Sequence, residues 1–169
     1  MSRRSSVVTV GDDVTVRKMS SDEADAVSAL VVASFDEFIG PEYDERGRTE
    51  FHRYAEPDAI RRRIRKDHFV MLAEVKSTLV GMIEIREANH VSLLFVAKAF
   101  HHRGVARELF DQALVEARQI RPGLAHVTVN SSRHGLSAYE KLGFRQTGPE
   151  RAVNGIVFIP MAKRLQGIS

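Results

Sequence analysis

Three consecutive segments in the middle of the chain are rich in apolar and β-branched residues and are separated by short polar breaks, a pattern typical of β-strands. They read HFVMLAEV (68–75), LVGMIEIRE (79–87) and HVSLLFVA (90–97). The breaks, Lys-Ser-Thr and an Ala-Asn turn, are short enough to join only antiparallel neighbours. The pattern therefore predicts an antiparallel three-stranded meander.

A helical period replaces the strand pattern after Gly104, where apolar residues recur every three or four positions. This apolar stripe consists of Ala106, Leu109, Phe110, Ala113, Leu114 and Ala117. Pro122 and Gly123 end the predicted helix. Another helix is expected after the Ser/Asp cap and acidic turn at residues 20–23, and a short one at about residues 58–66.

The remaining apolar runs continue this alternation of strands and helices. Strands are expected at residues 14–19, 125–130 and 155–165, and Gly143 closes a short helix between the last two. Residues 36–57 contain several aromatic side chains and are interrupted by Gly-Pro, and we expect this segment to be irregular. A strand, a helix and a strand in succession form a crossover and hence a parallel pair.

This order of elements predicts the fold class and the domain. We expect an α/β fold (mixed α+β) whose central sheet is mixed but mostly antiparallel, with about six to seven strands and about four helices on both faces. A chain of 169 residues suits one domain. We place it at residues 13–166, after a flexible N-terminal segment at residues 1–12.

Composition narrows the possible chemistry. The chain has no cysteine, which excludes disulfides, Cys-ligated zinc and a cysteine nucleophile. The histidines show no metal-ligand spacing, so no metal is expected. The densest basic cluster, IRRRIRK (60–66), has Ile60 and Ile64 four residues apart, which makes its arginines the solvated face of a helix rather than a nucleic-acid site. No apolar run approaches a membrane span, and we expect a cytoplasmic protein with neither nucleic acid nor membrane as partner.

The segment FHHRGVARELF (100–110) joins the last strand of the meander to the following helix. The first N–H groups of a helix have no intrahelical partner, and the macrodipole makes that end positive. Gly104 allows a positive φ and close approach of a ligand to the backbone, while the small Ala106 leaves the first turn open. By itself the segment fits an anion site and a plain turn equally well.

Two motifs in this part of the chain make a family resemblance visible. The run His101-His102-Arg103-Gly104-Val105-Ala106 is similar to the Gln/Arg-x-x-Gly-x-Gly/Ala pyrophosphate loop of the GNAT acyltransferases, although His101 stands where the family has Gln or Arg. The block VNSSRHGLSAYEKLGF (129–144) resembles the end of the same family's domain, where a strand ends in Asn and a Tyr-Glu-Lys-Leu-Gly-Phe helix follows. The resemblance extends over about residues 14–165 and implies the GNAT fold.

The resemblance also implies acetyl-CoA as co-substrate. The residues implied to bind it are Leu94, Phe95, Val96, His101, His102, Arg103, Gly104, Val105, Ala106, Asn130 and Tyr139. The N–H of Leu94 would face the acetyl carbonyl and that of Val96 the pantetheine, because the family's strand separates here from its neighbour. Tyr139 is the candidate general acid for the departing thiolate. A Tyr pKa of about 10 matches a thiol pKa of about 8.5 poorly, so Tyr139 needs a site that stabilises tyrosinate, or it only hydrogen-bonds the sulfur.

The general base has two candidates and an open alternative. His90 has a suitable pKa without perturbation and, by strand alternation, shares a face with Ser92 and Leu94. Glu84 is a carboxylate inside an apolar run, but it falls on the opposite face unless a β-bulge reverses the parity. A water-relayed base, or none, is the alternative.

The implied reaction is direct transfer of the acetyl group to a primary amine of a small molecule or a protein, since no cysteine is available to carry it. The aromatic segment would line the acceptor pocket, and Asp44, Glu45 and Glu50 are available to attract a cationic amine. Its candidate wall residues are Phe38, Tyr43, Phe51 and Tyr54. The departure at His101 keeps open a non-catalytic acyl-CoA-binding or regulatory domain of the same fold, and a homodimer also stays open.

Overall fold

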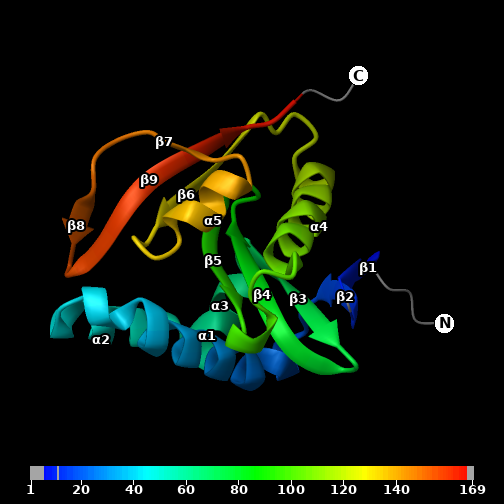
Figure 1. The fold of residues 1–169 in the computed structure, drawn as a ribbon, viewed down its shortest axis with the longest axis horizontal. Helices are drawn as coiled ribbons and strands as arrows, with labels where there is room; N and C mark the ends of the chain where they lie inside the picture. The colour runs from blue at the N-terminus through cyan, green and yellow to red at the C-terminus, as the bar shows by residue number, and fades with distance from the viewer. Residues whose placement is uncertain (1–5, 11, 167–169) are drawn as a thin grey trace.

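The centre of the molecule is a twisted sheet (Figure 1), in a computed structural model that describes residues 6–10 and 12–166. The strand order is β1-β2-β3-β4-β5-β6-β9-β7, and β8 pairs with β9 off this path. Neighbours are antiparallel except β5 and β6, which are parallel. The strands are β1 (Ser6–Val10), β2 (Asp12–Lys18), β3 (His68–Val75), β4 (Thr78–Arg86), β5 (His90–Val96), β6 (His126–Ser131), β7 (Arg145–Gln146), β8 (Arg151–Val153) and β9 (Ile156–Arg164).

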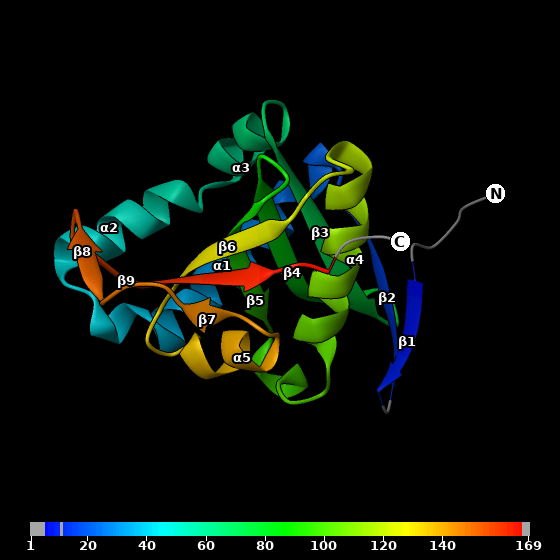
Figure 2. The ribbon, with the colours of Figure 1, turned by 90° about the horizontal axis from the view of Figure 1, so that it is seen from above.

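Helices cover both faces of the sheet (Figures 1 and 2). They are α1 (Ala24–Phe38), α2 (Glu45–Tyr54), α3 (Pro57–Ile64), α4 (Val105–Ile120) and α5 (Leu136–Lys141). On one face, Leu109 of α4 and Tyr139 of α5 belong to the same apolar core as Ile83 of β4. On the other face, α1 and α3 bury Val31 and Ile60 in a second core. The mixed, mostly antiparallel sheet between two helical layers is the predicted fold class, which is confirmed.

The strongest sequence patterns correspond to observed elements. The meander appears as β3, β4 and β5, and the stripe after Gly104 appears as α4, which buries Val105, Leu109, Phe110, Ala113 and Ala117. Gly143, expected to close the helix before it, has a φ of +100°. These segments were predictable because each buries one continuous apolar face.

Two segments differ from expectation. Within residues 36–57, expected to be irregular, α2 forms: Asp44 accepts a hydrogen bond from the N–H of Gly47 at 2.8 Å, and basic residues occupy the last turn. Local capping and charge therefore support a helix that carries only two large apolar residues, Phe51 and Tyr54. Within residues 1–12, expected to be a flexible terminus, the run Ser6–Val10 forms β1 on the edge of the sheet; residues 1–5 and 11 lie outside the described residues.

A β-bulge changes the faces of β5. Glu84 pairs with Leu93 but Ile85 pairs with Val91, so Ser92 is an extra residue on β5. Leu93 consequently points into the core beneath α1 and α3, whereas Val91 packs in the core beneath α4. The parity of the strand is thus reversed at this point, as a bulge requires.

The bulge corrects the expected placement of His90. Its cross-strand partner Arg86 lies two residues from Glu84 on β4, so strand alternation places His90 on the Glu84 face. Leu94 packs against the opposite core. His90 and Leu94 therefore do not share a face.

Helix α2 is held against the β8–β9 turn by a close backbone approach. A Cβ on Gly47 would lie 2.1 Å from the carbonyl oxygen of Gly155, and Gly155 itself has a φ of +79°. Only glycine accommodates both the close contact and the left-handed backbone. This contact joins α2 to the end of the sheet that carries β9.

We expect Gly47→Ala to lower the free energy of unfolding by about 1–3 kcal/mol, because the added methyl group forces α2 away from the β8–β9 turn. Gly123→Ala is the matched control, since no atom lies within 4 Å of its Cβ position; we expect a change within about 0.5 kcal/mol. Urea unfolding of both variants measures the difference, and equal stabilities would contradict the assigned contact.

Candidate functional site

The parallel pair β5–β6 is joined over only a short length. Pairing covers His90 with Thr128 and Val91 with Val129, although β5 continues to Val96 and β6 to Ser131. Beyond Val91 the two strands separate. The edge of β5 that faces β6 therefore carries backbone polar groups without a strand partner.

Strand alternation identifies which groups face the opening. The N–H of Ala97 donates to the carbonyl of Val80 at 2.8 Å, on the β4 side. Because alternate residues turn their N–H groups to the same side, Phe95 also faces β4, while Leu94 and Val96 face the opening. The Nε2 of His101 lies 2.7 Å from the carbonyl oxygen of Val96, which shows that the polar edge of Val96 points there.

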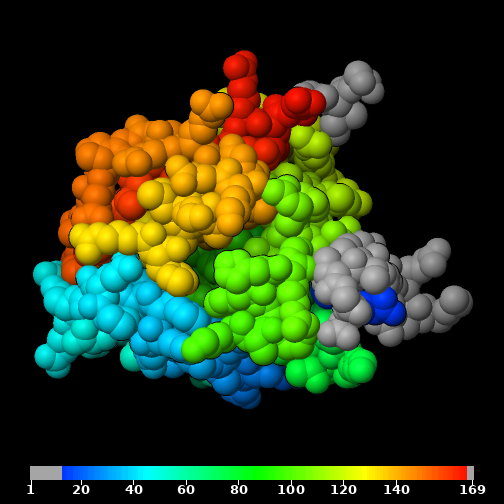
Figure 3. All heavy atoms as spheres, in the orientation of Figure 1, coloured from blue at the N-terminus to red at the C-terminus, as the bar shows by residue number. Residues whose placement is uncertain are grey.

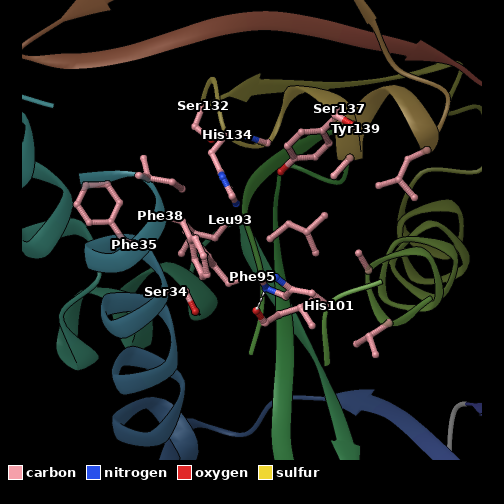
Figure 4. Close-up of a pocket in the computed structure, with 18 of the residues that line it drawn as sticks. Ser34, Phe35, Phe38, Leu93, Phe95, His101, Ser132, His134, Ser137 and Tyr139 are labelled. Carbon is pink, nitrogen blue, oxygen red and sulfur yellow. Dashed lines mark hydrogen bonds between the residues drawn. The ribbon is translucent and has the colours of Figure 1, made fainter. Parts of the chain in front are cut away.

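A cavity of about 640 Å³ surrounds this opening. Its walls come from α1, α2, β5, the β5–α4 turn, the start of α4, the β6–α5 segment and α5. Figure 3 shows the hollow between α1, the β5–α4 turn and the β6–α5 segment, and Figure 4 shows side chains from all three pointing into it. Its volume is that of a small-molecule site.

Most of the expected cofactor residues line this cavity. These are Leu94, Phe95, Val96, His101, His102, Gly104, Val105, Ala106, Asn130 and Tyr139. Arg103 does not; its guanidinium lies 5.3 Å from the centre of the Phe100 ring. The residues that the resemblance implied therefore lie together on one side of the cavity, and their role in binding the cofactor stays a prediction.

The turn before α4 has the geometry of an anion cradle. Gly104 has a φ of +80° and precedes the first helical residue, and His102 also adopts a positive φ, of +61°. No side chain caps α4, so the N–H groups of its first turn are available to a ligand. The positive end of the helix dipole favours an anion at this position.

Two cations that the sequence motifs did not single out stand beside the cradle. Arg107 and Lys141 line the cavity, and Arg107 donates to the carbonyl of Lys141 at 2.5 Å, which ties α4 to α5. Arg107 directly follows Ala106 of the first motif and Lys141 lies within the second, where it was given no role; the packing of the two helices brings them together. They add positive charge where the helix dipole already favours anions.

Tyr139 stands at the inner end of the cavity. It lies on α5, is 9% exposed, and its hydroxyl points into the cavity (Figure 4). Burial raises the pKa of Tyr139 above its usual value. The hydroxyl therefore stays protonated and acts as a hydrogen-bond donor at any physiological pH.

Glu84 is completely buried and its two oxygens are occupied. Arg63 donates from Nε at 2.6 Å and from Nη2 at 3.0 Å, and the Nδ1 of His68 lies 2.5 Å away. Arg63 also lies 3.6 Å above the ring of Tyr54 and so links α2, α3 and β4. Burial opposes ionisation, but the hydrogen bonds from His68 and Arg63 outweigh it and lower the pKa of Glu84. Glu84 does not line the cavity.

His90 lies at the closed end of the β5–β6 pair. Its Nδ1 is 2.8 Å from the hydroxyl of Thr128, and it does not line the cavity. Burial, with Arg86 and His68 nearby, lowers the pKa of His90 to about 4. Neither expected base therefore reaches the cavity directly: Glu84 is enclosed by its partners, and the bulge turns His90 away from Leu94.

The sequence anticipated part of the opposite side of the cavity, although Tyr54, also expected as a wall residue, does not line it. Its aromatic wall contains Phe35, Phe38, Tyr43, Phe51 and Phe95. His134 stacks on Phe38, with ring centres 4.9 Å apart, and Ser132 lies close by in the β6–α5 segment (Figure 4). Phe38, Tyr43 and Phe51 were expected as wall residues; Phe35 and His134 had no distinguishing signal, because helix packing alone places them.

The described part of the chain contains neither a membrane-spanning helix nor a metal-binding cluster. No helix there is long and apolar enough to cross a membrane. No group of three or more His, Cys, Asp or Glu residues there is arranged to hold a metal ion.

Comparison with known proteins agrees with this geometry. The model of the family "Acetyltransferase (GNAT) domain" matches residues 39–165. The fold is similar to a GCN5-related N-acetyltransferase from Rhodopseudomonas palustris (TM-score 0.75, 21% identity, 89% of this chain and 94% of that one). It is also similar to the PaiA N-acetyltransferase of Thermoplasma acidophilum in complex with coenzyme A (TM-score 0.76, 18% identity, 90% of this chain and 99% of that one). A third similar structure is an aminoglycoside 6'-N-acetyltransferase complexed with coenzyme A (TM-score 0.62, 14% identity, 88% of this chain and 96% of that one). The chain belongs to the GNAT family and is a CoA-dependent acyltransferase.

Proposed function

We infer that this protein transfers an acetyl group from acetyl-CoA directly to a primary amine. One observation carries the inference: the unpaired edge of β5, the uncapped start of α4 and the Tyr139 hydroxyl all face one cavity. The start of α4, with Arg107 and Lys141, suits a pyrophosphate. The free edge of β5 suits the amide groups of an extended pantetheine arm, which would add to it as a strand does.

The reaction needs few groups from the protein. The amine nitrogen bonds to the acetyl carbon, the carbon–sulfur bond breaks, and the proton lost by nitrogen ends on the thiolate. The N–H of Leu94 faces the opening and suits stabilisation of negative charge on the carbonyl oxygen. The absence of cysteine agrees with direct attack.

Tyr139 is suited to hold the sulfur rather than to give up its proton. Burial raises the pKa of Tyr139, which disfavours a tyrosinate. A hydrogen bond from a neutral hydroxyl to the departing sulfur still lowers the barrier. This supports the second of the two roles that the sequence left open.

The geometry favours the open alternative for the base, deprotonation by water or none. Glu84 lies outside the cavity, as do Arg63, with which it pairs, and Tyr54, on which Arg63 stacks. We therefore assign Glu84 a structural role. An acceptor that enters this largely apolar cavity loses water, which itself favours the neutral amine.

Acetyl-CoA should raise the melting temperature of the protein. At a free concentration of 100 times its Kd, a ligand increases the free energy of unfolding by about 2.7 kcal/mol. Ala106→Glu adds an anion to the first turn of α4, and we expect it to weaken acetyl-CoA binding by about tenfold or more through like-charge repulsion. Ala106→Gln is the neutral control of equal size. No melting shift at millimolar acetyl-CoA, or equal Kd values for the two variants, would contradict the cradle.

Tyr139→Phe should lower kcat by about 100-fold or more, within the range of a single transition-state hydrogen bond or proton donor, with little change in acetyl-CoA affinity. Stopped-flow or steady-state thiol release gives kcat, and calorimetry gives the affinity. Because Tyr139 stays protonated, wild-type activity should show no alkaline loss near pH 10. Unchanged turnover in the variant would remove Tyr139 from the mechanism.

Glu84→Gln should lower the free energy of unfolding at pH 7 by about 3–5 kcal/mol, since it breaks a buried ion pair from one side. The lowered pKa of Glu84 makes its contribution present above the unfolded pKa of about 4.3 and lost as pH falls through the folded-state pKa. The gap between variant and wild type should therefore shrink on acidification.

The pH profile of kcat/KM separates this role from that of a base. We expect the profile of Glu84→Gln to keep the shape of the wild-type profile, because Glu84 does not contact the amine. Glu150→Gln, which breaks the exposed pair with Arg133, is the surface control. If the Glu84 variant alone lost the acidic limb of the kcat/KM profile, Glu84 would be the general base.

A further inference from the structure

The cavity has two sides of different character. The side formed by α4 and α5 carries its charged lining residues, Arg107 and Lys141. The side formed by α1, α2 and the α1-facing residues of β5 is apolar, with aromatic rings in close succession. Phe35 stacks on Phe51 with ring centres 3.8 Å apart, and Phe51 meets Phe95 at 6.0 Å.

The polar groups of the aromatic side are turned away from the cavity. The hydroxyl of Tyr43 donates to the carbonyl of Val157 at 3.1 Å, so this residue presents its ring. The other polar residues on this side are the serines Ser34, Ser92 and Ser132 and, at the rim, His134. The compartment therefore offers hydrogen bonds but little charge.

No aspartate or glutamate lines the cavity within the described part of the chain. Of the acids expected to attract a cationic amine, Asp44 caps α2 and Glu50 pairs with Arg53. The third, Glu45 in the first turn of α2, does not line the cavity. Glu37 pairs with Lys98, and Glu84 is enclosed by Arg63 and His68. Glu42, beside Tyr43, does not reach the lining either.

A compartment of this kind discriminates by charge. A primary amine must lose its proton to attack, and desolvation by apolar walls favours that loss. A second ammonium group on the same molecule gains nothing from being neutral and finds no carboxylate to pair with, so burying it costs free energy. An apolar body, in contrast, is stabilised by contact with the aromatic wall.

Space adds a limit on size. The cavity of about 640 Å³ must hold the thioester end of the donor as well as the acceptor, and small-molecule sites span about 300–1,000 Å³ for one ligand. The share left for the acceptor suits a compact molecule.

We propose that the acceptor is a small primary monoamine with an apolar body, aromatic or aliphatic, and that Phe38 and Phe51 of the neutral aromatic wall select it against polyamines and other polycations. The proposal rests on the acetyl transfer inferred above and names the substrate class of that same site. Phe38, held between His134 and His101 with ring centres at 4.9 and 5.3 Å, marks the boundary between the acceptor and donor sides.

The sharpest test compares two acceptors that differ by one charge. Hexylamine and 1,6-diaminohexane have the same chain, and only the second carries a distal ammonium group. At saturating acetyl-CoA, followed by release of free CoA thiol, we expect kcat/KM for hexylamine to exceed that for the diamine by about 100-fold or more, as expected when a buried charged group is left unpaired. 2-Phenylethylamine should likewise exceed ethylamine, and a tripeptide with a free α-amine should be a poor acceptor.

Variants locate the selectivity. Phe51→Glu places a carboxylate in the wall and should reduce or reverse the hexylamine preference; Phe38→Glu tests the same idea on α1, should the first variant fail to fold. Val115→Glu makes the same change on an exposed position of α4 and should leave the preference unchanged. The melting shift with acetyl-CoA reports folding and donor binding in each protein.

The possible outcomes distinguish failure of the proposed acceptor class from failure of the proposed acetyl transfer. Absence of any acetyl-CoA melting shift overturns the proposed function itself. A normal shift with equal or preferred use of the diamine, with transfer to the peptide only, or with no transfer to any of these amines overturns the acceptor class alone. A hexylamine preference that both glutamate variants leave intact overturns the role of Phe38 and Phe51.

Discussion

The organisation of the site depends on a pair of parallel strands that stop bonding to each other. After Val91 and Val129, β5 and β6 diverge, and the backbone of β5 is left with hydrogen-bonding groups that no strand satisfies. Buried backbone groups are rarely left unpaired, so this edge requires a partner that is extended and polar. The cavity, the cradle at the start of α4 and the position of Tyr139 all follow from that divergence.

The same divergence explains the role of His101. It occupies the position at which related proteins have Gln or Arg, and its ring bonds to the carbonyl of Val96. A side chain from the following turn thus satisfies one of the groups that the separated strands leave free. The substitution is compatible with the cradle, because the N–H groups of α4 and the positive φ of Gly104 are properties of the backbone.

The two faces of the sheet support different sides of the cavity. The face beneath α4 and α5 supports the side of the cavity that contains the uncapped start of α4, and the face beneath α1 and α3 supports the aromatic side. Glu84 belongs to the second face, where its pairing with Arg63 and His68 offsets the cost of a buried carboxylate and fixes α3 and Tyr54 against the sheet. A carboxylate in the middle of an apolar strand looked like a catalytic base; its full burial and its two partners make it a structural anchor next to the site.

The hydrophobic pattern of the sequence was sufficient to predict an element wherever that element buries one continuous apolar face. The meander and α4 are of this kind. The two motifs at residues 101–106 and 129–144 pointed to one side of the cavity through the family resemblance that they carry, and the cofactor-binding role of that side stays a prediction. Helix α2 was missed because it has only two large apolar residues, Phe51 and Tyr54, and depends on capping and on contact with the β8–β9 turn. The orientation of His90 depended on one extra residue, Ser92, and the pairing of Glu84 with Arg63 and His68 joined segments that are separate in the chain. Periodicity reports which face of an element is buried, but bulges and ion pairs form only when elements meet, and here they decide which side chains reach the cavity.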